Sequence, residues 1–147
     1  MAVYTVEINR TPEDVFAYLD DLNRHKEWDD MILETRVETE GPTRVGTRAT
    51  DKRQLPLGKQ DVPYEITEHD PPRRSAFRGT EGPVRPAGSV TIEPLDGGSR
   101  SRVTLEFALE ATNLLGKLLA PLANREARKH VPKQQARIKE RLESGAT

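Results

Sequence analysis

The sequence contains no cysteine, which excludes disulfide bonds, thiolate nucleophiles and cysteine-ligated zinc sites. It also lacks any apolar run close to the roughly 18 residues that a membrane span needs. The first ten residues, MAVYTVEINR, do not have the basic and apolar regions of a signal peptide. These absences lead us to expect a soluble, cytoplasmic protein with no membrane span.

Hydrophobic side chains are also scarce, at 34% of the 147 residues. A chain of this length is expected to form one domain, which we place at residues 1–147, and to bury about two-thirds of its unfolded surface. A core with so few hydrophobic side chains can less easily surround a wide cavity. We therefore expect any internal pocket to be modest in size or to be filled by a ligand.

Charge is nearly balanced overall, at −1, but it is unevenly distributed. Residues 1–40 carry 4 basic and 11 acidic side chains, a net −7, whereas residues 114–147 carry 8 basic and 3 acidic ones, a net +5. A basic C-terminal segment of this kind could bind an anionic partner, but an ordinary solvated helix would have the same composition.

The chain begins with an alternating segment, Val3–Asn9, that predicts a strand. Thr11 is a good N-cap and Pro12 suits a first helical position, so a helix is expected to start there. A second short helix is expected over Leu22–Trp28. After it the sequence changes to a period of two, with glycine or proline between segments, which predicts an antiparallel meander. The six predicted strands are Ile32–Glu40, Thr47–Leu55, Asp61–His69, Arg74–Gly79, Ser89–Pro94 and Arg100–Glu110.

Two segments depart from simple patterns. Thr47–Leu55 is polar on both faces, and we interpret it either as an edge strand blunted by charge or as the rim of a water-filled opening. The last segment, Leu114–Ser144, has leucines at helical spacing. Pro121 is expected in the first turn of a long helix, after a separate turn over Leu114–Ala120, and Pro132 is expected to bend that helix.

The order β-α-α-β-β-β-β-β-β-α resembles the helix-grip superfamily of START-like (SRPBCC) proteins, and most closely its small bacterial members described as polyketide cyclase/dehydrase or lipid-transport proteins. The resemblance implies an α+β fold, in which a seven-stranded curved antiparallel sheet with two short helices holds the long C-terminal helix on its concave face and encloses a cavity. The residues that carry it are TPEDVFAYLDDLNRHKEWDD (11–30), VGT (45–47), YEITEHDPPRRSAF (64–77) and LLGKLLAPL (114–122).

The resemblance also implies a set of ligand-binding residues on the inward faces of the sheet and the helix. Trp28 matches the family tryptophan that follows the second short helix, beside the cavity. A filled core and an apolar pocket would have the same pattern, so the sequence leaves both open. The other implied cavity residues are Tyr64, Ile66, Phe77, Val90, Ile92, Leu105, Phe107, Leu115, Leu118, Leu119 and Leu122.

Motifs for cofactors and metals are missing: the sequence has no P-loop, no dinucleotide fingerprint, no G-x-S-x-G and no paired histidines, so we expect no cofactor and no metal site. His25 stands among carboxylates and is interpreted as a solvated helix residue, and His69 as the end of a strand before a rigid turn. His130 would face the cavity only if the bend at Pro132 turned it inward.

Three functions remain open. The leading hypothesis is the binding of a small hydrophobic or polycyclic molecule between the sheet and the C-terminal helix. A polyketide aromatase/cyclase-type enzyme would need catalytic groups, for which Tyr64, Asp51 and Arg53 are the candidates, with Arg48 also within reach of an opening. A protein- or RNA-interaction module would use the basic C-terminal helix, but no aromatic residues lie among its basic ones, which argues against nucleic acid as a partner.

Overall fold

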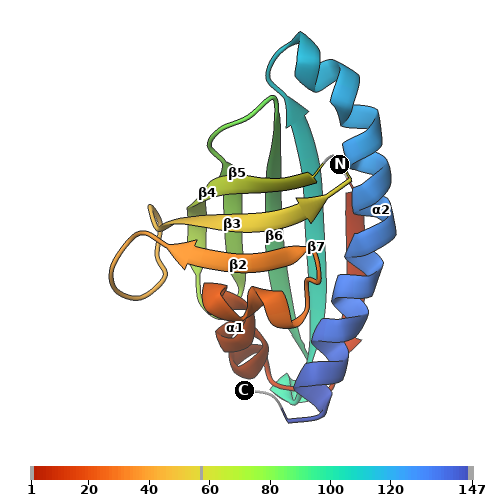
Figure 1. Cartoon of the computed structure of the whole chain (residues 1–147). Helices are drawn as coiled ribbons and strands as arrows, with labels where there is room; N and C mark the ends of the chain where they lie inside the picture. The colour runs from red at the N-terminus through yellow and green to blue at the C-terminus, as the bar shows by residue number, and fades with distance from the viewer. Residues whose placement is uncertain (1, 57, 146–147) are drawn as a thin grey trace.

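The computed structural model describes residues 2–56 and 58–145. Its strands form one antiparallel sheet in the order β1-β7-β6-β5-β4-β3-β2. In Figure 1, β6 and β7 run alongside the long helix α2, whereas β2 and β3 lie across it, because the sheet is strongly curved. The strands are β1 (Ala2–Ile8), β2 (Ile32–Val37), β3 (Arg48–Leu55), β4 (Gly58–Asp70), β5 (Arg74–Gly79), β6 (Val84–Leu95) and β7 (Arg100–Ala111). The helices are α1 (Pro12–Asp20), η1 (Leu22–Glu27), η2 (Asp96–Gly98) and α2 (Leu114–Glu143).

The predicted seven-stranded sheet with two short helices and a long C-terminal helix is confirmed. The first helix begins where its capping residues predict, since the hydroxyl of Thr11 accepts a hydrogen bond from the backbone N–H of Asp14 at 3.2 Å. Arg10 then ties α1 to the end of α2, because its guanidinium donates to Asp14 and also to the carbonyl oxygen of Leu142 at 2.6 Å.

Of the two interpretations of the polar segment Thr47–Leu55, the edge strand is ruled out, because β3 pairs with β4 on one side and β2 on the other. The edges of the sheet are β1 and β2.

The predicted start of β6 is wrong, since the strand begins at Val84 rather than at Ser89. It therefore includes Pro86 and Gly88, which the prediction places between strands. Pairing with β7 along its whole length overrides these local breakers. Gly88 is required there, because a Cβ atom would come within 2.7 Å of the Phe77 ring.

The prediction of a separate turn before α2 is also wrong, since one helix runs from Leu114 through both prolines. The side chain of Asn113 caps this helix by accepting a hydrogen bond from the N–H of Gly116 at 2.8 Å, so the helix starts well before Pro121. Pro121 removes one internal hydrogen bond, and the helix continues past it. Among the described residues, no helix is long and apolar enough to cross a bilayer.

The main hydrophobic core lies at the lower end of the molecule in Figure 1, where α1 packs between the sheet and the last turns of α2. A second, smaller cluster joins Leu22 of η1 to the inner faces of β3 and β4. The main core consists of Ile8, Val15, Phe16, Tyr18, Ile92, Val103, Ile138 and Leu142.

Candidate functional site: the cavity between the sheet and α2

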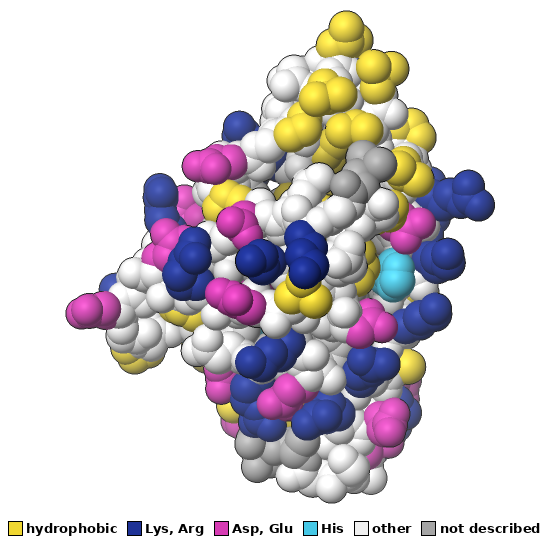
Figure 2. Space-filling model, viewed as in Figure 1, with side chains coloured by type: hydrophobic (Ala, Val, Ile, Leu, Met, Phe, Trp, Pro, Cys, Tyr) yellow, Lys and Arg dark blue, Asp and Glu magenta, His cyan; other side chains and the backbone are white. Residues whose placement is uncertain are grey.

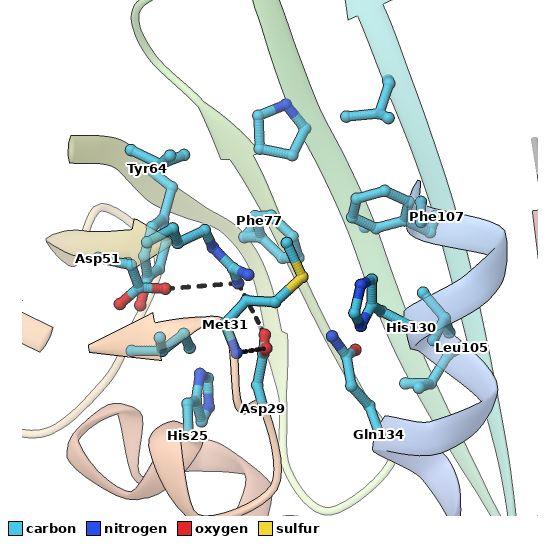
Figure 3. A pocket seen from close by; sticks show the side chains of 18 of the residues that line it. His25, Asp29, Met31, Asp51, Tyr64, Phe77, Leu105, Phe107, His130 and Gln134 are labelled. Atoms are coloured by element: carbon cyan, nitrogen blue, oxygen red, sulfur yellow. Dashed lines mark hydrogen bonds and ion pairs between the residues drawn. The ribbon is translucent and has the colours of Figure 1, made fainter. Parts of the chain in front are cut away.

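A cavity of about 400 Å³ lies between the concave face of the sheet and α2, above the main core. This volume is within the usual range of small-molecule sites, roughly 300–1,000 Å³. The cavity reaches the surface beside Leu122, which lines it and is itself 39% exposed. Figure 3 shows its two unlike walls: aromatic and aliphatic side chains from the sheet and α2, and a cluster of charged side chains from β3 and the segment after η1.

Most of the residues that the family resemblance implied do lie in the cavity wall. Leu119 and Leu122 contribute from α2, and Trp28 from the segment after η1. The sheet residues of that set in the wall are Tyr64, Ile66, Phe77, Val90, Leu105 and Phe107.

Three of the implied residues lie elsewhere, and these expectations are corrected. Ile92 packs in the main core, below the cavity. Leu115 and Leu118 are exposed, Leu118 by 71%. The reason is the orientation of the first turns of α2, where Gly116 is buried against the carbonyl of Pro83. Leu118 follows two residues later, at about 200° around the helix, so it points away from the sheet.

His25 was expected to be solvated and instead lines the cavity. Its Nε2 atom lies 2.7 Å from the carbonyl oxygen of Leu19, so this nitrogen donates the hydrogen bond and Nδ1 is left without a proton in the neutral ring. The ring packs against Trp28 with 4.8 Å between ring centroids. Burial lowers the pKa of His25, with the hydrogen bond to Leu19 opposing it, so the imidazole is held neutral.

A buried ion-pair cluster forms the polar wall of the cavity. Asp29 and Asp51 are only 2% and 4% exposed. The guanidinium Nη2 atom of Arg53 lies 2.9 Å from a carboxylate oxygen of Asp29 and 3.8 Å from one of Asp51. Asp29 also accepts a hydrogen bond from the N–H of Met31 at 3.1 Å, and Asp51 one from the hydroxyl of Thr35 at 2.8 Å. Figure 3 shows contacts of this cluster as dashed lines.

Burial raises the pKa of Asp51, and the positive charge of Arg53 opposes that rise.

The polar sequence of β3 has a structural explanation. β3 is an inner strand whose side chains Asp51 and Arg53 line the cavity. Arg48, which was expected near an opening, is absent from the cavity wall; its side chain is largely exposed and lies 3.7 Å from Glu65.

Tyr64 lies on the same wall and has an unpaired hydroxyl group. The residue is 6% exposed, and its hydroxyl makes no hydrogen bond to any described residue. Burial raises the pKa of Tyr64, and the negative charge of Asp51 raises it further, so the phenol stays protonated. The indole N–H of Trp28 is likewise buried with no partner among the described residues. Buried donors without acceptors are uncommon and costly.

The facing wall on α2 is less polar. His130 lies in it with Nε2 3.3 Å from a carboxylate oxygen of Glu126, and Gln134 follows one turn later.

Three polar residues of the cavity wall were not identified from the sequence: Asp29, Glu126 and Gln134. The available signal for Glu126 and Gln134 was their helical spacing with His130; the sequence offers no local signal for Asp29. No group of three or more potential metal ligands converges anywhere in residues 2–56 and 58–145.

Comparison with known proteins gives one family and several solved structures. The family profile described as polyketide cyclase / dehydrase and lipid transport matches residues 2–143. No curated protein matches the chain. A protein from Thermus thermophilus is 22% identical, with a TM-score of 0.74 and 99% of each chain covered. A START superfamily protein from Mycobacterium smegmatis is 15% identical, with a TM-score of 0.74 over 96% of this chain and 97% of that one. The Zhui aromatase/cyclase from Streptomyces sp. R1128 is 15% identical, with a TM-score of 0.76 over 95% of this chain and 93% of that one. These likenesses establish the helix-grip fold.

Proposed function

We propose that this chain, which belongs to the polyketide cyclase/dehydrase and lipid-transport family, binds one small hydrophobic or polycyclic molecule in the cavity between its sheet and α2. The observation that carries the proposal is the cavity itself, about 400 Å³ in a protein whose hydrophobic content is only 34%. Protein interiors normally pack at the density of organic crystals. Side chains that line a cavity of this size lack the contacts of a packed interior, and an apolar ligand would supply them.

The residues on the cavity walls fit a flat or elongated apolar guest. Phe77 and Phe107 offer aromatic faces from neighbouring parts of the sheet, and small residues, Ala123 and Ala127, keep the α2 side open. Apolar surface removed from water contributes about 25 cal/mol per Å², so a guest covering these side chains would gain several kcal/mol.

The proposal is tested by filling the cavity from the helix side. Ala127→Phe places a ring in the space, whereas Ala136→Phe adds the same ring on the exposed face of the same helix and is the control. Thermal-shift and native mass-spectrometry measurements would use palmitic acid, decylubiquinone and 2-acetylanthracene. We expect one-to-one binding of at least one compound to the wild type and to Ala136→Phe, and at least tenfold weaker binding to Ala127→Phe. Failure of all three compounds to bind the wild type would refute the proposal.

An aromatase/cyclase-type reaction is a second candidate, favoured by the meeting of Asp51, Arg53 and Tyr64 on one cavity wall. A carboxyl group whose pKa lies above its ordinary value can exchange protons nearer to neutral pH, and a neutral phenol can polarise a carbonyl group. The test is cyclisation of a synthetic poly-β-ketone, followed by chromatography. Turnover by the wild type that persisted in both Asp51→Asn and Tyr64→Phe would count against this reaction at this wall.

A further inference from the structure

We infer that the polar wall of the cavity selects neutral ligands that carry a hydrogen-bond-accepting oxygen, such as a ketone or quinone carbonyl, and discriminates against carboxylates. This inference rests on the proposed ligand-binding function and specifies the class of ligand. It is carried by two features of the wall: hydrogen-bond donors without partners, and a local charge that is not positive despite the arginine.

The donors lie on one face of two paired strands. Tyr64 of β4 pairs with Ala49 of β3, and Asp51 and Arg53 follow Ala49 at alternate positions, so their side chains emerge on the same face as that of Tyr64. Figure 3 shows Tyr64 and Asp51 side by side at this wall, which faces Phe107 and His130 across the cavity. The charges of Asp51 and Arg53 both act on the Tyr64 phenol, so an oxygen atom placed beside the phenol would also lie in the field of the Arg53 guanidinium group.

The unpaired hydrogen-bond donors at this wall would be satisfied by an acceptor atom on the ligand. The phenol of Tyr64 is buried and unpaired within the described chain. The only hydrogen bond that the Arg53 side chain makes to described residues runs from Nη2 to Asp29, which leaves its other N–H groups free to donate. Because an unpaired buried donor is costly, a ligand oxygen that accepts a hydrogen bond from it recovers part of that cost.

The charges of the same cluster oppose an anion. Arg53 lies within 4 Å of two carboxylates, those of Asp29 and Asp51, so the three groups sum to −1 when both acids are ionised and to zero when one is protonated. His25 faces the cluster and adds no positive charge, since burial keeps it neutral. A ligand carboxylate placed beside these acids would be desolvated and repelled, because the guanidinium group of Arg53 is already paired with Asp29. A carbonyl oxygen gains the hydrogen bonds without that cost.

Three matched compounds test the inference: 2-acetylanthracene, 2-ethylanthracene and anthracene-2-carboxylic acid share one ring system and differ in the polar group. Their own fluorescence reports binding in titrations at pH 7.5. We expect the ketone to bind about 3- to 10-fold more tightly than the ethyl compound, which is the net value of one hydrogen bond. The carboxylate is expected to bind at least tenfold more weakly than the ketone.

Variants assign the preference to named groups. Tyr64→Phe should reduce the ratio of ketone affinity to ethyl-compound affinity to near one. Tyr18→Phe is the matched control, because Tyr18 is buried in the main core, with its hydroxyl bonded to Glu27. Asp51→Asn should strengthen binding of the carboxylate compound at least fivefold relative to binding of the ethyl compound.

The possible outcomes separate the inference from the function on which it rests. If the three compounds bind with equal affinity, the polar-wall inference is overturned and ligand binding stands. Tightest binding by the carboxylate overturns the charge argument. A ketone preference that survives Tyr64→Phe and is lost in Tyr18→Phe contradicts the assignment to this wall. If no compound binds at all, the proposed function itself fails.

Discussion

The two ends of α2 both carry apolar side chains and have opposite surroundings. In its last turns Ile138 and Leu142 are fully buried, at 1% and 0% exposure, against α1 and the sheet. In its first turns most leucines are exposed, although Leu119 lines the cavity, and Figure 2 shows hydrophobic side chains gathered at the top of the molecule, where α2 begins. The exposed leucines there are Leu114, Leu115, Leu118 and Leu122.

What differs between the ends is the element that shares the space with α2. At the lower end, α1 inserts Val15 and Phe16 between the sheet and the helix, and the space is filled. At the upper end the cavity occupies the corresponding position and opens beside Leu122. The comparison shows that an apolar stripe on a helix does not by itself produce a packed core; it also needs a third layer. In this protein the lower end of α2 contributes to the stability of the fold, and the upper end borders the cavity.

The largest expected effect on stability comes from truncating a core side chain in the last turns of α2. Leu142→Ala removes a fully buried side chain from the main core, and we expect the free energy of unfolding to fall by about 2–5 kcal/mol. Urea unfolding followed by circular dichroism measures it. A loss below about 1 kcal/mol, less than such a truncation costs in a packed core, would mean that the lower end is as loosely packed as the upper one. The contrast between the two ends would then disappear.

A smaller effect on stability is expected from replacing the buried carboxyl group of Asp51 at the cavity wall. Burial raises the pKa of Asp51 above its ordinary value of 3.8, so its contribution to stability is greatest below that pH and is lost as the pH rises through the folded-state pKa. At pH 7 the buried carboxyl group therefore opposes folding. Asp51→Asn should raise the thermal midpoint by about 2–4 °C at pH 7, and the gain should shrink toward pH 4.

The control for this measurement is Asp30→Asn, which changes an exposed carboxylate next to the buried Asp29 and should leave the midpoint within about 1 °C. A lower midpoint for Asp51→Asn at pH 7 would show that the attraction to Arg53 outweighs the cost of burial. The cavity wall would then be a stabilising element, like the core at the other end.

The fold followed from the sequence because its signals are local. The alternation of apolar residues predicted the strands, with β5 placed at its observed bounds, and the cap at Thr11 placed α1. The errors arose where long-range pairing overrides local preference. Pro86 and Gly88 were interpreted as breakers, yet β7 pairs with β6 across them, and Asn113 starts α2 upstream of Pro121.

The site could be predicted only in part, because its apolar and polar walls arise differently. Apolar residues such as Ile66 and Phe107 are visible as one face of a strand. The contact between Asp29 and Arg53 joins positions far apart in the chain and depends on how the segment after η1 folds against β3. Nothing local distinguishes Asp29 from the exposed acids near it, and His25 looks like a solvated residue until that segment encloses it.

The smallest expected effect comes from the exposed end of α2, and it tests the comparison most directly. Leu118→Ala removes the same atoms as Leu142→Ala from the same helix, but from a side chain that is 71% exposed. Because little apolar surface returns to water, the free energy of unfolding should change by no more than about 0.5 kcal/mol. The urea measurement used for Leu142→Ala applies unchanged. A loss above about 1.5 kcal/mol, which is outside the range of an exposed site, would place Leu118 in a packed contact, and the two ends of α2 would no longer differ in kind.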